Sequence, residues 1–435
     1  MGYLEACLNA VLAQDYPDFE VIVVDNDSTD GSADFVAAQY PQVRLIRNER
    51  NLGFAAGNNI GLRAADGDVL VLLNQDTEAR PGWLAALVEA VQDPTVGIVG
   101  CKLLYPDGTI QHAGGFIADE RGLSGHFGHR ESDAEQYNVI RDTDFVTGAA
   151  IALTRATLAR IGPLDEGFAR AYYEDVDWCY RARAAGLRVF YYPQAVAVHY
   201  VSTTLKEGSD AYRASFHAGR LRFLFKHRSL DDLQTTFMTA ESVAINALEP
   251  GGELEALREA LVGVLFALPD IVHFRLCDIG SNIASSLVLD ALLRVAMDLR
   301  ELCVKERPFQ ASQTASDEGE TWDSRLVLLH NQWQITPHTF HSEMPVLGKG
   351  IATFRKTWLN VAARWYVDDF RAQQCAFNAS VTQLLSQIAA NTIRGQQENA
   401  QHVRELNVLL SEVLHLRMRV AELEAKLIQR QSESE

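Results

Sequence analysis

The chain has 435 residues, of which 47% are hydrophobic and 22% charged, a composition that predicts packed domains and excludes a wholly disordered protein. Its formal net charge of −18 argues against a general nucleic-acid-binding protein, because such proteins need a basic face to displace counterions from phosphates. The six cysteines are scattered and include no CxxC pair, and no apolar run is long enough to cross a membrane. We therefore predict a cytoplasmic protein, and leave peripheral contact at the inner face of the cell membrane open.

The first hundred residues alternate between short apolar runs and segments with helical spacing. Strands are predicted at 19–24, 43–46, 69–73 and 96–101, and helices at 4–12, 31–39, 54–65 and 81–91. This alternation is typical of an α/β fold with a mostly parallel sheet, flanking helices and right-handed crossovers.

The pattern becomes less regular after the fourth predicted strand. The segment 106–142 is rich in glycine and histidine and has little periodicity. Further on, strands are predicted at 145–153, 188–192 and 195–199, with a helix that follows 172–177 and a basic helix at 212–227.

The remainder of the chain has a helical pattern without recognisable chemistry. Heptads with leucine and valine at both seam positions predict a coiled coil, which would allow a homo-oligomer, although an amphipathic helix packed on its own domain is the alternative. We divide the chain into a domain at 1–228, a helical region at 229–305, a linker at 306–323, a helical region at 324–395 and a coiled coil at 396–431.

Two carboxylates follow predicted strands, where ligands bind in parallel sheets. The five apolar residues of 69–73 predict a strand buried on both faces, and Asn74 and Asp76 come directly after it. Carboxylate oxygens suit Mg²⁺ or Mn²⁺ held against a diphosphate, although a strand-ending turn explains the same residues. Asp25 ends an earlier strand in the same way, with a helix-capping turn as its alternative.

Glu174, Asp175 and Asp177 crowd three carboxylates at the start of a predicted helix. Crowding raises the pKa of one carboxylate, which improves a general base. The alternative is a favourable charge–dipole placement, with Asp177 pairing with Arg181 four residues later.

Taken together, residues 3–227 resemble the family-2 glycosyltransferases of the GT-A fold, nearest the rhamnosyltransferase-like members that build bacterial surface polysaccharides. The resemblance rests on four ordered motifs, 24–31 (VDNDSTDG), 51–59 (NLGFAAGNN), 73–77 (LNQDT) and 174–178 (EDVDW), followed by His199. It implies an inverting transfer from a UDP- or dTDP-sugar, such as dTDP-rhamnose, to a saccharide or lipid-linked saccharide.

The resemblance also implies roles for individual residues. Asp175 would be the catalytic base, with Glu174 orienting the acceptor, and Asp76 and His199 would hold Mg²⁺ or Mn²⁺. The donor would contact Asp25, Asn51, Gly53, Asn58, Asn74 and Asp76, and the acceptor would contact Gly148, Ala149 and Trp178. Asn74 stands where the family's Asp-x-Asp motif has its first aspartate, so the site has one charge fewer.

The family normally begins with a buried strand that precedes the helix starting here near Leu4. This chain lacks such a strand, so we expect either a start upstream or a truncated protein. Two other functions are considered: a sugar-nucleotide pyrophosphorylase, and a non-catalytic assembly protein that acts through its helices and coiled coil. The pyrophosphorylase would need a glycine-rich loop with a basic residue near the N-terminus, which is not found.

Overall fold

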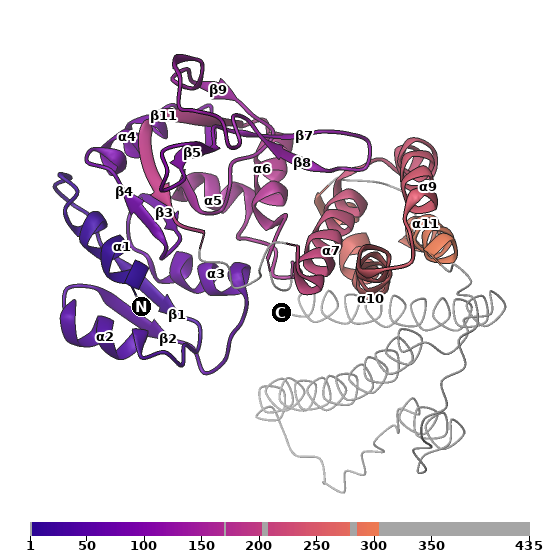
Figure 1. Ribbon diagram of the computed structural model, residues 1–435, viewed down its shortest axis with the longest axis horizontal. Coiled ribbons are helices and arrows are strands. Elements are labelled where there is room, and N and C mark those ends of the chain that lie inside the picture. Colours follow the sequence, from indigo (N-terminus) through magenta and orange to yellow (C-terminus); the bar gives the residue numbers. More distant parts are fainter. Residues whose placement is uncertain (1, 169–170, 202–207, 279–284, 304–435) are drawn as a thin grey trace, which may run out of the picture. The chain divides into compact units, whose positions relative to one another are not determined.

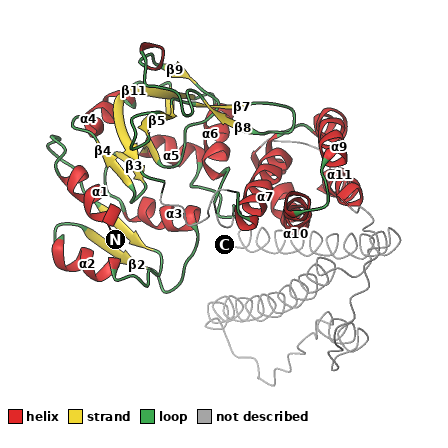
Figure 2. Ribbon diagram, in the orientation of Figure 1, coloured by secondary structure: helices red, strands yellow, loops and turns green. Residues whose placement is uncertain are grey.

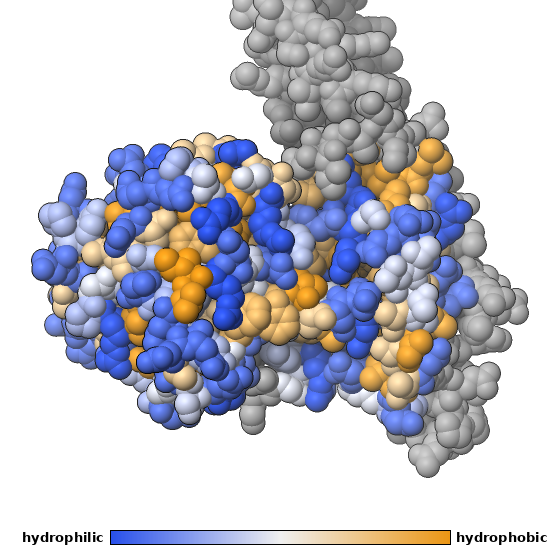
Figure 3. Space-filling model, turned by 90° about the horizontal axis from the view of Figure 1, so that it is seen from above, coloured by the Kyte–Doolittle hydropathy of each residue, from blue (hydrophilic) through white to orange (hydrophobic). Residues whose placement is uncertain are grey.

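The computed structural model describes residues 2–168, 171–201, 208–278 and 285–303, all within one compact unit (Figure 1). The predicted linker, the helical region 324–395 and the coiled coil lie outside the described residues. No described helix is long and apolar enough to cross a membrane. One face of the molecule, seen in Figure 3, mixes hydrophilic side chains with small apolar patches.

The N-terminal layer forms a small parallel sheet with helices packed against it. Its elements are α1 (Gly2–Leu12), β1 (Ile22–Asp25), α2 (Ser32–Gln39), β2 (Arg44–Arg47) and α3 (Phe54–Ala64). β1 pairs with β2 in parallel, and within the described residues neither joins the larger sheet. The helical spacing in α1 and α2 places their apolar side chains on this sheet, in a cluster of Leu4, Leu8, Val36, Tyr40 and Val43.

The larger sheet contains seven strands within the described residues. Five of them lie in the order β3 (Val69–Leu73), β10 (Ala150–Thr154), β5 (Val96–Leu104), β11 (Arg188–His199) and β4 (Thr77–Ala79). β6 (Ile110–His112) pairs with β5, and β9 (Arg141–Asp142) pairs with β11. The two strands predicted at 188–192 and 195–199 are thus one strand, β11, with a register shift between Tyr192 and Val196.

The prediction of a mostly parallel sheet is wrong, because this sheet is mixed. Among its described strands, β5 and β11 are the one parallel pair, and β10 runs antiparallel to both β3 and β5. β10 enters from the loop-rich segment 105–149 rather than through a helical crossover, so it can run against both neighbours. β3 is also not buried on both faces: its residues alternate between half-buried and buried, and β10 is its one partner among the described strands.

Helices cover the larger sheet (Figure 2). α4 (Trp83–Ala90) and α6 (Glu174–Ala184) both pack against β5 and β11, which explains why eight of the nine residues of β5 are buried. α5 (Arg155–Ile161) follows β10 directly, and the Thr154 side chain caps its first turn.

The segment 106–142 contains short elements that its composition did not predict. A β-hairpin joins β7 (Gly115–Ile117) to β8 (Ser124–His126), and a 3-10 helix, η1, spans Glu135–Tyr137. Elements of three residues are too short to show a hydrophobic period, so the sequence pattern could not reveal them.

The helical region packs on the α/β part. Its elements are α7 (Asp210–His227), α8 (Leu230–Asp232), the π-helix η2 (Leu233–Phe237), α9 (Met238–Ala247), α10 (Gly252–Asp278) and α11 (Ser285–Cys303). α7 lies between α6 and α10 and contacts both. The side chains that α7 buries include Leu221, Phe223, Leu224 and Phe225.

Candidate active site

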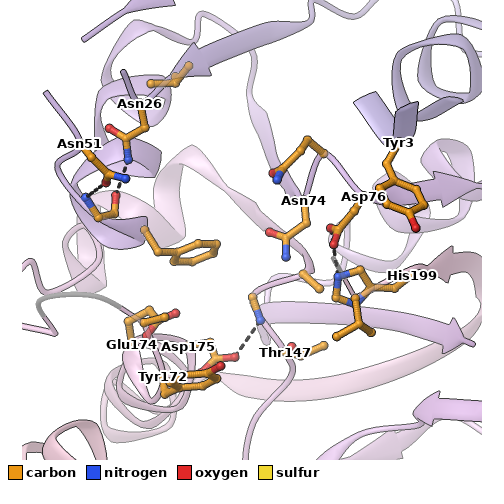
Figure 4. Close-up of a pocket in the computed structure, with 18 of the residues that line it drawn as sticks. Tyr3, Asn26, Asn51, Asn74, Asp76, Thr147, Tyr172, Glu174, Asp175 and His199 are labelled. Carbon is orange, nitrogen blue, oxygen red and sulfur yellow. Dashed lines mark hydrogen bonds and ion pairs between the residues drawn. The ribbon is translucent and has the colours of Figure 1, made fainter. Parts of the chain in front are cut away.

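A pocket of about 1090 Å³ opens between the N-terminal layer, the end of β3, the loop 145–149 and the start of α6 (Figure 4). Small-molecule sites typically occupy roughly 300–1,000 Å³, so this pocket has room for a large ligand or two smaller ones. Predicted site residues that line it are Asp25, Asn51, Gly53, Asn74, Asp76, Gly148, Ala149, Glu174, Asp175 and His199.

Asn26 organises the wall of the pocket next to Asp25. Its side-chain nitrogen donates to the Gly53 carbonyl at 2.9 Å, and its side-chain oxygen accepts from the Leu52 N–H at 3.1 Å. The Asn51 side chain accepts from the Gly53 N–H at 2.9 Å, and Gly53 has φ 83°, which only glycine adopts easily. The motif containing Asn26 was recognised in the sequence, but its role as the link between β1 and the loop 48–53 was not.

Asn58 was predicted to contact the donor and does not line the pocket, so this prediction is corrected. It sits one turn inside α3, and its side chain donates to the Phe54 carbonyl of the same helix at 2.9 Å. The Asn58 side chain is thus bound to the backbone of its own helix.

Asp76 and His199 lie together, although 123 residues separate them. Oδ1 of Asp76 is 3.1 Å from Nε2 of His199, and Nδ1 of His199 is 2.7 Å from Oε1 of Gln111. The pairing of β11 with β4 brings them together, because His199 lies opposite Thr77, the residue after Asp76. Gln111 orients the imidazole through this contact.

The chemistry of this pair fits a divalent cation. An amide oxygen can only accept, so the contact with Oε1 of Gln111 assigns a hydrogen to Nδ1 of His199, and Nε2 is the ring nitrogen that faces the Asp76 carboxylate. A carboxylate oxygen and an imidazole nitrogen are both common ligands of divalent cations in proteins. No group of three or more His, Cys, Asp or Glu that could hold a metal occurs within the described residues, so phosphate oxygens and water would complete the coordination.

Glu174 and Asp175 begin α6 at another side of the pocket (Figure 4). Glu174 is 6% exposed, and Oε2 has no hydrogen-bond partner within the described part of the chain. Burial, together with the neighbouring Asp175 charge, raises the pKa of Glu174 to about 8. Burial also raises the pKa of Asp175, while backbone hydrogen bonds oppose this shift.

The backbone around the pair holds Asp175 in place. Oδ2 of Asp175 accepts from the Gly148 N–H at 2.8 Å, and Oδ1 accepts from the Val176 N–H at 2.8 Å. Tyr172 and Tyr173, just before the pair, have φ of 83° and 71°, an unfavourable conformation for aromatic residues that persists because neighbouring segments impose it. Each carboxylate oxygen of Asp175 keeps a second lone pair, so Asp175 can still accept a proton.

Trp178 was predicted to contact the acceptor, and this prediction is corrected. Its side chain is fully buried, does not line the pocket, and donates from Nε1 to the Gly162 carbonyl at 2.9 Å. Asp177 also points into the interior, where it pairs with Arg181 at 2.9 Å; the alternative interpretation of the sequence contained this pair, although the pair is buried rather than on the helix surface. Burial alone would raise the pKa of Asp177, but the charges of Arg181 and Lys226 hold it well below its usual range.

Comparison with known proteins identifies the family. Residues 2–146 match the family described as Glycosyl transferase family 2. This segment is a family-2 glycosyltransferase domain. It contains Asp25, Asp76 and Gln111, whereas Glu174, Asp175 and His199 lie beyond the matched residues. The match favours a glycosyltransferase over a pyrophosphorylase.

Individual relatives cover different shares of the chain. The O-antigen biosynthesis protein RfbC of Myxococcus xanthus is 35% identical over 46% of this chain and 16% of its own length. The N-acetylglucosaminyl-diphospho-decaprenol L-rhamnosyltransferase of Mycobacterium tuberculosis is 27% identical over 48% of this chain and 75% of its own length. A crystal structure of GalNAc-T7 with UDP, GalNAc and Mn²⁺ is 18% identical with a TM-score of 0.44, over 56% of this chain and 48% of that chain. The chain thus spans only a small part of RfbC.

Proposed function

We propose that this chain is an inverting, metal-dependent glycosyltransferase that acts in surface polysaccharide synthesis. It would move a sugar from a UDP- or dTDP-sugar to a saccharide or lipid-linked saccharide. The names of two relatives support this role, since one is an O-antigen biosynthesis protein and the other an L-rhamnosyltransferase. We take dTDP-rhamnose and an N-acetylglucosaminyl-diphospholipid as the first donor and acceptor to test.

The donor half of the site would use Asp25, Asp76 and His199. Asp25 would accept the ring N–H of uracil or thymine at the end of β1, beside the loop that Asn26 secures. Asp76 and His199 would hold Mg²⁺ or Mn²⁺, which when bound neutralises the departing diphosphate. Gln111 would orient the imidazole for this role by accepting a hydrogen bond from Nδ1–H, which leaves Nε2 as the nitrogen that would face the metal.

The acceptor half would use Glu174 and Asp175. The acceptor hydroxyl attacks the anomeric carbon, the bond from that carbon to the diphosphate breaks, and the hydroxyl proton passes to Asp175. Gly148 and Val176 fix the carboxylate while leaving it a free lone pair for this proton. With its pKa near 8, Glu174 is mainly protonated at neutral pH, so it leaves the negative charge to Asp175 and can donate to the acceptor.

One observation carries the proposal: a pocket of about 1090 Å³ is lined by a carboxylate–imidazole pair on one side and by the buried Glu174 and half-buried Asp175 on another. Moving a sugar from a diphosphate to a hydroxyl group has two chemical needs: a pair of ligands that hold a metal ion at the diphosphate, and a general base for the hydroxyl proton. Their presence in one pocket, from segments far apart in the sequence, is what a glycosyltransferase requires.

The substitution Asp175→Asn tests the proposal. It keeps the size of the side chain but removes the base, so the transfer rate is expected to fall by about 100- to 10,000-fold. Donor affinity, measured by calorimetry with dTDP-rhamnose and Mn²⁺, is expected to stay within about twofold, because Asp175 does not contact the donor in this scheme. Transfer by the unaltered chain should need added Mg²⁺ or Mn²⁺.

The control is Asp270→Asn on an exposed position of α10, which should leave transfer unchanged. Undiminished transfer by Asp175→Asn would remove Asp175 as the base. A parent chain that neither binds nor consumes a nucleotide sugar in the presence of metal would contradict the proposed function itself.

A further inference from the structure

Two imidazoles beside the pocket have no role in the scheme above. His112 lies in β6 and is fully buried, and His126 ends β8 and lines the pocket. Their Nδ1 atoms are 2.7 Å apart, and their rings meet nearly edge to face. A hydrogen bond between two histidine side chains requires that one nitrogen donates and the other accepts, so the protons on this pair are ordered.

The backbone decides which nitrogen carries each proton. The Thr147 N–H points at Nε2 of His112 at 3.4 Å, so this nitrogen accepts and the proton of neutral His112 sits on Nδ1. Nδ1 of His112 therefore donates to Nδ1 of His126, which leaves the proton of neutral His126 on Nε2. Burial lowers the pKa of His112 well below its usual value and that of His126 to about 4, so both rings are neutral at pH 7.

The Nε2–H group of His126 is the donor that the contact with His112 does not use. Within the described residues no protein group accepts a hydrogen bond from Nε2 of His126, and this atom is not among the buried polar atoms that lack a partner. The same pocket wall contains Thr147 and Gly148, and the Gly148 N–H binds Asp175. His126 thus lies beside the loop that holds the proposed base.

We propose that His126 binds the acceptor saccharide by donating its Nε2–H to an oxygen of that sugar, and that His112 is the positioning residue that fixes this tautomer. The inference rests on the proposed function. A fixed, neutral N–H can donate to a hydroxyl, ether or carbonyl oxygen, but it cannot bind an ammonium group, which has no lone pair. His126 would therefore select an acceptor sugar with an oxygen next to the hydroxyl that reacts at Asp175.

The substitution His126→Asn tests the acceptor contact. The Asn side-chain oxygen can take the place of Nδ1 and accept from His112, but Asn is too short to reach the position of Nε2. The KM for the N-acetylglucosaminyl-diphospholipid is expected to rise about 2- to 12-fold, as for the loss of one neutral hydrogen bond. The KM for dTDP-rhamnose and its slow hydrolysis by water should stay within about twofold.

Two further variants make the test specific. His129→Asn, at an exposed histidine of the same segment, is the matched control and should leave all constants unchanged. His112→Phe removes the donor to His126, so nitrogen-15 spectra of labelled histidine should show His126 shifting from the Nε2–H tautomer to a mixture, with a higher acceptor KM. A purely structural role for His112 would not move this spectroscopic signal.

The outcomes separate the two proposals. If the parent chain transfers sugar and His126→Asn keeps the parental acceptor KM, the inference is wrong and the proposed function stands. If His126→Asn loses donor hydrolysis as much as transfer, His126 does not act through the acceptor and the inference is likewise wrong. A parent chain without any nucleotide-sugar turnover would overturn both.

Discussion

At the scale of single residues, the site combines side chains that the sequence marks and side chains that only the fold can place. Asp76 could be singled out because it follows an apolar strand, and Glu174 and Asp175 because they crowd one helix start. Gln111 gave no such signal, because its role depends on the 2.7 Å contact with His199, which is 88 residues away. Contacts between residues so far apart in the sequence cannot be predicted from local residue spacing.

The two residues that were assigned wrongly share a physical cause. Asn58 and Trp178 both belong to motifs at helix starts, yet each lies about a turn inside its helix. Side chains at that depth pack on the helix itself or on the core, so Asn58 binds the Phe54 carbonyl and Trp178 binds the Gly162 carbonyl. Membership in a motif therefore predicts proximity to a site but not the direction of a side chain.

Glu174 should make the stability of the chain depend on pH. Its pKa is about 8 in the folded chain and near the usual 4.5 when unfolded, so between these values the folded chain holds a proton that unfolding releases. The stabilisation from the protonated carboxyl is full below about pH 4.5 and is lost as the pH rises through 8. We expect the free energy of unfolding, relative to Glu174→Gln, to fall by a few kcal/mol across this window.

Urea unfolding of both chains at several pH values measures this difference. The control Glu259→Gln, at an exposed position of α10, reports what an ordinary Glu-to-Gln change does under the same conditions. A difference between the parent and Glu174→Gln that stays constant with pH would mean that the carboxyl is ionised throughout, and Glu174 could not then donate to an acceptor.

At the scale of elements, local pattern and tertiary pairing made separate contributions. The helices and strands of the first hundred residues were predicted close to their observed positions, because their hydrophobic periods are strong. The direction of β10 was not, since an apolar run looks the same in a parallel and an antiparallel strand. The five apolar residues of β3 likewise could not show that β3 has a single partner strand among those described.

α7 approaches the backbone of the segment before α6 closely at Gly219. A Cβ at Gly219 of α7 would lie 2.3 Å from the Tyr172 carbonyl oxygen, a backbone atom that cannot move without shifting Tyr172 and Tyr173. We expect Gly219→Ala to destabilise the chain by about 1–3 kcal/mol. Because Glu174 and Asp175 follow this segment directly, transfer should fall as well.

The matched control for this prediction is Gly263→Ala in α10. A Cβ there meets no atom within 4 Å, and alanine favours a helix over glycine by up to about 1 kcal/mol, so this variant should be as stable as the parent or more so. Thermal unfolding and transfer rates of the two variants give the comparison. Equal stability of Gly219→Ala and the parent would mean that α7 can move away from Tyr172 freely.

At the scale of the whole described unit, the helical region is tied to the α/β part by buried polar contacts. Arg220 of α7 is fully buried, pairs with Glu241 of α9 and donates to the Arg121 carbonyl at the tip of the β7–β8 hairpin. The same hairpin binds the hydroxyl of Tyr173 through Gly122 and Ser124. The helices thus contact, through one hairpin, the segment that carries the proposed base.

Arg275 of α10 makes the clearest link across the predicted boundary at residue 228. One guanidinium nitrogen donates to the carbonyls of Phe225 and Arg228, each at 2.7 Å, and so satisfies carbonyl groups at the C-terminal end of α7. Arg275→Ala would leave these buried carbonyls without a partner, and we expect a loss of about 2–3 kcal/mol. Arg294→Ala, at an exposed position of α11, should change stability by no more than about 0.5 kcal/mol.

Hydrogen exchange in increasing urea, followed on peptides from β5 and from α10, tests whether the boundary separates two folding units. If the contacts across it hold the described residues in one cooperative unit, Arg275→Ala should lower the opening free energy of both peptides equally. Loss of protection in α10 alone would instead make the helical region an independent domain, as the division at residue 228 predicts. In that case α7 could change its contact with Tyr172 without unfolding the sheet, and the helices could regulate the acceptor half of the site.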